Sequence, residues 1–141
     1  MAKLNTFSRD GDAMRNGEWV NPGTEYGGIQ IRTRALGAAY ADARAGRLKR
    51  AAREAGREDL IGQAEKNRID IEALCETCLL DVRGLQHDDA PDGTPGGDVT
   101  IAEFKELILK DEHAELALLA FLCAQMVGQK RKLQAEIAAG N

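Results

Sequence analysis

Apolar and polar residues alternate in one short stretch near the start of the chain, and a helical period covers most of the rest. Residues 29–34 alternate, so that Ile29 and Ile31 share one side of an extended segment. Trp19 precedes them across a turn rich in Pro and Gly, and the pattern predicts a β-hairpin over residues 18–34. Because a lone hairpin is marginally stable in water, its apolar face is expected to pack on helices or on a strand of another chain.

Longer stretches with apolar residues three and four positions apart predict helices. The first helix is expected from about residue 35 to 57, and the second from about 58 to 82. Thr100 and Glu103 form a capping box that fixes the start of a third helix, because each side chain can bond to the other's backbone amide. A break near residues 111–112 separates it from a last helix, whose apolar residues extend around most of its circumference.

These elements predict a mainly α fold, a small domain of about four helices with a short N-terminal β-hairpin. The polar residues 1–16 are expected to form a flexible arm, and residues 17–129 the single helical domain. Residues 130–141 are expected to form a C-terminal tail, basic at first and then polar. Residues 86–98 contain four Asp, two Pro and three Gly, and are expected to form a surface loop.

Composition and charge refine this picture. The chain has 141 residues, enough to bury a core without disulfides or metals. Because 4% of the residues are aromatic, that core must consist mainly of Leu, Ile, Val and Ala. The net charge of -4 is divided unevenly. Residues 1–57 carry eleven Lys and Arg against six Asp and Glu, a net of +5, whereas residues 58–141 carry eight against seventeen, a net of -9. Such a chain can pair its own basic and acidic helices or offer each part to a different partner.

Arginines gather on the polar side of the first predicted helix. The candidate basic face consists of Arg44, Arg47, Arg50 and Arg53. It is a poor candidate for nucleic acid, because the whole chain is acidic and only Tyr40 lies among the arginines as an aromatic that could stack on a base. Solvent or an acidic protein partner is favoured instead.

No pattern in the sequence indicates catalysis, a cofactor or a metal site, so an enzyme is not expected. Cys75 and Cys78 have the spacing of a redox or zinc motif, yet they fall inside a predicted helix, and together with Cys123 we interpret them as core residues. The acidic loop lacks two oxygen ligands of a calcium loop, including the bidentate one. The sole serine, Ser8, lies in the expected arm, and the two histidines have no evident carboxylate partner.

The sequence also lacks the patterns of export and membrane insertion. The N-terminus has no apolar run typical of a signal peptide, and the longest apolar-rich segment, residues 116–127, is too short to cross about 30 Å of hydrocarbon. Three cysteines, an odd number, fit a reducing compartment. We therefore expect a cytosolic protein without membrane contacts.

Several short segments follow one another along the chain in a characteristic order. They are a hairpin that opens with Gly17-Glu18-Trp19-Val20, the strand Ile29-Gln30-Ile31-Arg32 with a basic helix after it, Leu79-Leu80-Asp81-Val82-Arg83-Gly84-Leu85, an Asp- and Gly-rich loop, and Val99-Thr100-Ile101-Ala102-Glu103. In this order, from about residue 17 to 129, the chain resembles the tail assembly chaperones of long-tailed bacteriophages. It departs from them at Val82, where they often carry tryptophan, at Thr100, where they often carry serine, and in an enlarged loop.

The resemblance implies a protein of the infected host's cytoplasm that coats the tape-measure protein before the tail tube polymerises, and that helps to recruit tail tube subunits. Such chaperones are often made in two lengths by ribosomal frameshifting and are absent from the finished virion. We also expect self-association into a homo-oligomer. A long helical client needs an apolar groove, and Met adapts to varied partners. The candidate partner-binding residues are Trp19, Ile29, Ile31, Leu116, Leu119, Phe121, Leu122 and Met126.

Two other functions stay open on the residues alone. A structural virion protein of the neck or head-tail connection would add its hairpin to a neighbour's sheet and would be present in purified particles. A small nucleic-acid-binding regulator would use the arginine face, and its affinity would fall steeply with salt. A tail chaperone, in contrast, would bind a tape-measure segment and be lost from mature particles.

Overall fold

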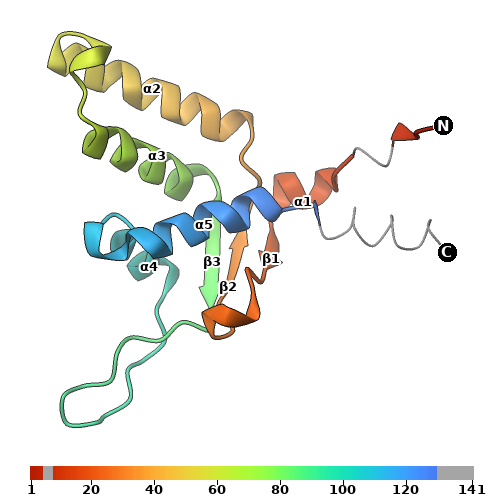
Figure 1. Ribbon diagram of the computed structural model, residues 1–141, viewed down its shortest axis with the longest axis vertical. Coiled ribbons are helices and arrows are strands. Elements are labelled where there is room, and N and C mark those ends of the chain that lie inside the picture. The colour runs from red at the N-terminus through yellow and green to blue at the C-terminus, as the bar shows by residue number, and fades with distance from the viewer. Residues whose placement is uncertain (5–7, 130–141) are drawn as a thin grey trace.

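Figure 1 shows the computed structural model, which describes residues 1–4 and 8–129. Its α-helices are α1 (Gly11–Asn16), α2 (Ala38–Ala55), α3 (Gln63–Thr77), α4 (Ile101–Leu107) and α5 (Ala114–Met126). Its strands are β1 (Glu18–Val20), β2 (Gln30–Thr33) and β3 (Leu79–Arg83), and short 3-10 turns are η2 (Thr24–Tyr26), η3 (Glu58–Leu60) and η4 (Asp111–His113). The predicted mainly α class is confirmed, with five α-helices in the described part of the chain where about four were expected. The tail predicted at residues 130–141 lies outside the described residues.

The three strands form one antiparallel sheet in the order β1-β2-β3. The hairpin predicted over residues 18–34 supplies the first two strands, with Val20 opposite Ile31. Ile31 is in turn opposite Val82 of β3, and all three side chains are buried. The hairpin is therefore completed by a third strand of the same chain, and its apolar face packs into this chain's own core.

The third strand corrects the prediction of one helix over residues 58–82. Helix α3 ends at Thr77, and the chain then extends into β3. The register between β2 and β3 shifts at a bulge, and the two buried residues of β3, Leu79 and Val82, stand three positions apart. This spacing imitates that of a helix, which is why the apolar stripe predicts a continuous helix where the structure has a strand.

The last residues of the loose arm expected over residues 1–16 form the helix α1. A side-chain oxygen of Asp10 caps α1, since it accepts two backbone amides of the first turn at 3.1 and 3.4 Å. Ala13 is buried in the core, and Arg9 donates to the backbone carbonyl of Gln125 at 3.1 Å. A six-residue helix with one buried side chain carries too little periodicity to be predicted from sequence.

Helix α5 lies across one face of the sheet (Figure 1), and the core fills the space between them. The largest fully buried side chains include Phe104, Ile31, Leu74 and Ile108. Helix α4 begins at the predicted capping box: Thr100 Oγ1 accepts the Glu103 amide at 3.2 Å, and the Glu103 carboxylate accepts the Thr100 amide at 3.1 Å. The second bond lowers the pKa of Glu103 below its usual range because it favours the charged carboxylate. The predicted break before α5 is the turn η4.

Residues 86–98, the predicted surface loop, project from the body of the molecule (Figure 1), and we call them the acidic loop. They lie in no helix or strand, apart from an isolated bridge between Gln86 and Asp98. His87 has a carboxylate partner that the sequence pattern does not indicate. Its Nε2 lies 2.7 Å from Glu103 Oε2. None of the helices in the described part of the chain is long and apolar enough to span a membrane.

Helices α2 and α3 lie side by side as a hairpin that projects beyond the sheet (Figure 1). Ion pairs join them: Arg44 to Asp70 at 2.6 Å, and Arg47 to Glu72 and, at 3.0 Å, to Glu76. The basic helix thus pairs with the acidic helix that follows it, which is the first of the two roles that the uneven charge allowed.

Arg47→Ala is expected to lower the free energy of unfolding by about 1 kcal/mol, because Glu76 loses its partner and Glu72 keeps only one. Arg50→Ala is the matched control, since Arg50 lies on the same helix, is exposed and forms no ion pair among the described residues. Its effect should stay within about 0.5 kcal/mol. Urea unfolding of both variants measures the difference, and equal midpoints would show that the ion pairs add nothing to stability.

Candidate functional site

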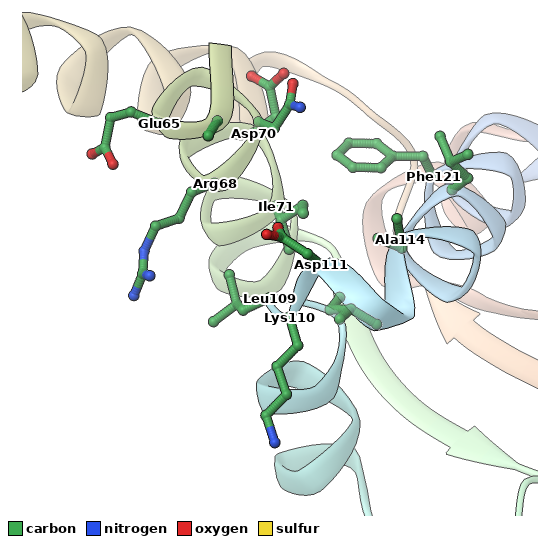
Figure 2. Close-up of a pocket in the computed structure, with 14 residues that line it drawn as sticks. Glu65, Arg68, Asp70, Ile71, Leu109, Lys110, Asp111, Ala114 and Phe121 are labelled. Atoms are coloured by element: carbon green, nitrogen blue, oxygen red, sulfur yellow. The ribbon is translucent and has the colours of Figure 1, made fainter. Parts of the chain in front are cut away.

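An open groove of about 710 Å³ lies between α3 and α5, and the connection from α4 to α5 forms part of its wall (Figure 2). We call it the α3–α5 groove. Its large apolar lining comes from all three segments: Ile71 on α3, Ile108 and Leu109 after α4, and Leu118 and Phe121 on α5. The groove therefore joins parts of the chain that are about fifty positions apart in sequence, such as Ile71 and Phe121, and no local sequence pattern predicts it.

Leu118 leaves most of its surface in solvent at the edge of this groove. Its exposed fraction is 69%, the highest of any large hydrophobic side chain between residues 8 and 129. Leu122, one turn further along α5, is 39% exposed. Leucines that stay exposed together beside an apolar groove are typical of a surface that contacts another protein.

The sequence of α5 explains why these leucines face outward. The helix is apolar on every side, and three of its buried residues are alanines, Ala117, Ala120 and Ala124. Small side chains let the helix lie close to the layer beneath it, because little volume has to fit between the backbones. Larger residues such as Leu118 and Phe121 then remain on the side of the groove.

Phe121 is fixed by an aromatic contact with Tyr40 of α2. The ring centroids are 6.3 Å apart and the ring planes meet at 79°, an edge-to-face arrangement. Burial raises the pKa of Tyr40, so its phenol stays neutral at physiological pH. The contact ties α2 to α5 and holds one wall of the groove in place without a ligand.

Charged side chains surround the apolar floor, and they are not equivalent. Arg68 and Asp70 of α3 already form ion pairs within the α2–α3 hairpin, at 2.7 and 2.6 Å. Figure 2 shows the side chains of Arg68 and Lys110 directed away from the groove, whereas the carboxylate of Asp111 points toward Ile71 across it. The charge that faces the interior of the groove is therefore negative.

Comparisons with protein-family models, with curated proteins and with solved structures found no match. What the groove binds has to be inferred from its own lining, exposure and charge.

Three of the predicted partner-binding residues belong to the core. Ile29, Ile31 and Leu119 have exposed fractions of 3%, 0% and 7%, so their side chains pack mainly in this chain's own core, although Ile29 and Leu119 also line a small hollow. They are buried because the hairpin pairs with β3 and the helices of the same chain cover its apolar face. Phe121 lines the α3–α5 groove, together with Leu118, which was not among the predicted residues because α5 has no polar side to orient it.

The other predicted residues lie in different parts of the molecule. Leu116 lines a smaller hollow of about 360 Å³ together with Ile29 and Leu119, and Met126 is half-buried against the core. Trp19 points to the side of the sheet opposite the core, where the Arg83 guanidinium lies 4.0 Å from the centre of its ring. The structure therefore brings three of the predicted partner-binding residues, Ile29, Leu116 and Leu119, to one small hollow and places the other five outside it.

The predicted basic face divides in two. Arg44 and Arg47 pair with the carboxylates of α3 and are half-buried. Arg50 and Arg53 are exposed on α2 and have no ion pair within the described residues. Two of the four arginines of the predicted basic face, Arg50 and Arg53, therefore remain available to a partner.

The three cysteines are free thiols. Cys78 and Cys123 are buried, which confirms their interpretation as core residues, and Cys75 is half-buried. Burial raises the pKa of Cys75 and of Cys123 to about 11, so both stay protonated at neutral pH and are poor nucleophiles. In the described parts of the chain no group of three or more His, Cys, Asp or Glu side chains is placed to hold a metal ion.

Proposed function

We propose that this chain is a phage tail assembly chaperone that holds a helical segment of the tape-measure protein in the α3–α5 groove. In this proposal it acts in the cytoplasm of the infected host, associates with further copies of itself and helps to recruit tail tube subunits. The observation that carries the proposal is the apolar groove bordered by Leu118, whose exposed fraction is 69%. The order of sequence segments from residue 17 to 129 supports it independently.

A helix is the shape that such a groove accommodates best. The two walls are themselves helices, α3 and α5, so a third helix could pack against both through side chains three and four positions apart. Its apolar stripe would cover Ile71, Leu118 and Phe121, which lie on facing walls. A long helical protein that exposes such a stripe before assembly would aggregate, and covering the stripe prevents this.

The alternative of a structural virion protein also has a physical basis. Among the described residues the sheet has three strands, and β1 and β3 are its outer strands, which offer backbone amides and carbonyls to a strand of a neighbour. The nucleic-acid alternative is weakened, because Arg44 and Arg47 are engaged with α3. The chaperone and the virion protein differ in where the protein is found after assembly.

Co-purification and particle analysis test the proposal together. The tape-measure protein of the same phage should co-purify with the tagged chain from cells that produce both, and purified particles should lack the chain by mass spectrometry. A tagged chain with Leu60→Glu, a change on η3 away from the groove, serves as control and should still co-purify. Abundant intact chain in particles, or no tape-measure protein with either chain, would contradict the chaperone.

A further inference from the structure

We propose that the α3–α5 groove is selective for a cationic amphipathic helix, one whose apolar stripe is flanked by Lys or Arg. This inference rests on the proposed function and names the chemistry of the client segment. It follows from the charges at the groove. Acidic and basic residues both line it, but the charge that a bound helix would meet is negative.

The charged side chains of α3 either form ion pairs within the chain or point away from the groove. Arg68 pairs with Glu72, and Asp70 pairs with Arg44, both within the α2–α3 hairpin. Glu65, the other charged residue that α3 contributes to the lining, points outward from the helix (Figure 2). The α3 wall therefore offers a client apolar surface and little net charge.

The opposite wall carries the charge that a client would meet. Asp111 lines the groove, its carboxylate points across it, and it forms no ion pair among the described residues. Lys110, the only lining cation on this wall, extends away from the groove. Glu112 and Glu115 line the smaller hollow and are also exposed. The N-terminal end of α5 is therefore acidic toward both the groove and the smaller hollow.

A basic residue on the client would satisfy this arrangement. The aliphatic part of a Lys or Arg side chain can lie on Leu109 and Ile71, while its charged head reaches Asp111. An acidic residue in the same place would meet a second carboxylate with no cation directed at it, and like charges at close range disfavour the complex. The groove thus discriminates by charge as well as by apolar contact.

Two synthetic helices test the selectivity with the full chain. Both peptides have about 20 residues and the same apolar stripe, and they differ only in carrying Lys or Glu at the flanking positions. Fluorescence anisotropy gives the two dissociation constants. The Lys peptide is expected to bind about fivefold more tightly than the Glu peptide, as for one or a few partly exposed ion pairs, and the ratio should shrink as salt rises.

Variants of Asp111 assign the effect to this side chain. Asp111→Asn should bring the ratio of the two dissociation constants close to one, and Asp111→Lys should reverse it. Asp92→Asn in the acidic loop removes the same charge outside the groove lining and should leave the ratio unchanged. Circular dichroism shows whether each variant is folded. If Asp111→Lys does not fold, the result with Asp111→Asn alone decides the test.

The outcomes separate this inference from the proposed function. Equal binding of both peptides to the unmodified chain, or an unchanged ratio in Asp111→Asn, would overturn charge selectivity while the groove still binds a helix. Failure of both peptides and of the tape-measure protein to bind would overturn the selectivity and the proposed function together.

Discussion

Phe104→Ala is expected to destabilise the domain by about 3 to 5 kcal/mol, the range found for truncating a buried phenylalanine. Phe104 is the largest of the fully buried side chains, with an exposed fraction of 0%. It stands on α4 in the core shared by the sheet, α3 and α5, so the cavity would open where several elements meet. Because domains of this size have a net stability of about 5 to 15 kcal/mol, this loss removes a large part of it.

Thermal and urea unfolding would measure the change, and Phe121→Ala is its matched control. Phe121 is the same residue type on α5, but it is half-exposed in the groove and part of its contact is with Tyr40. Its truncation should cost clearly less than that of Phe104, since fewer buried contacts are lost. Equal losses for the two variants would mean that α4 does not anchor the core as the structure has it.

The parts of the fold that follow from sequence are those with local causes. The hairpin over residues 18–34 has its alternation and its turn within a single stretch, and the start of α4 is fixed by two residues three positions apart, Thr100 and Glu103. Strand β3 has no such cause. It exists because it pairs with β2, about fifty positions earlier, and the bulge in that pairing gives Leu79 and Val82 a helical spacing.

The groove was less accessible to sequence reasoning than the fold. Phe121 was predicted as a contact residue because α5 has more apolar residues than one buried side requires. Which of them are exposed depends on how the helix rotates against the sheet, and that rotation is set by tertiary packing of its alanines. The sequence pattern therefore does not single out Leu118. The pairing of Arg44 and Arg47 with α3 was foreseen only as one of two roles for the charges, since a sequence does not show which helices lie side by side.

Leu118→Glu is expected to weaken binding of the tape-measure helix by about 30-fold or more, the effect of losing a central apolar contact at an interface. Leu118 borders the groove with 69% of its surface exposed, so a client that fills the groove must cover it. The introduced carboxylate would be buried in the complex, in a groove that Asp111 also lines, and burying an unpaired charge is costly.

The stability of the free chain should change by no more than about 0.5 kcal/mol, because Leu118 is mostly exposed and Leu and Glu have similar helix propensities. Leu60→Glu is the control for exposure, since Leu60 is 57% exposed but lies on η3, outside the groove lining. Anisotropy titrations with a fluorescent tape-measure segment should therefore separate the two variants, although both replace an exposed leucine by glutamate. If Leu60→Glu weakens binding and Leu118→Glu does not, the client contacts the tip of the α2–α3 hairpin, and the α3–α5 groove is not its binding site.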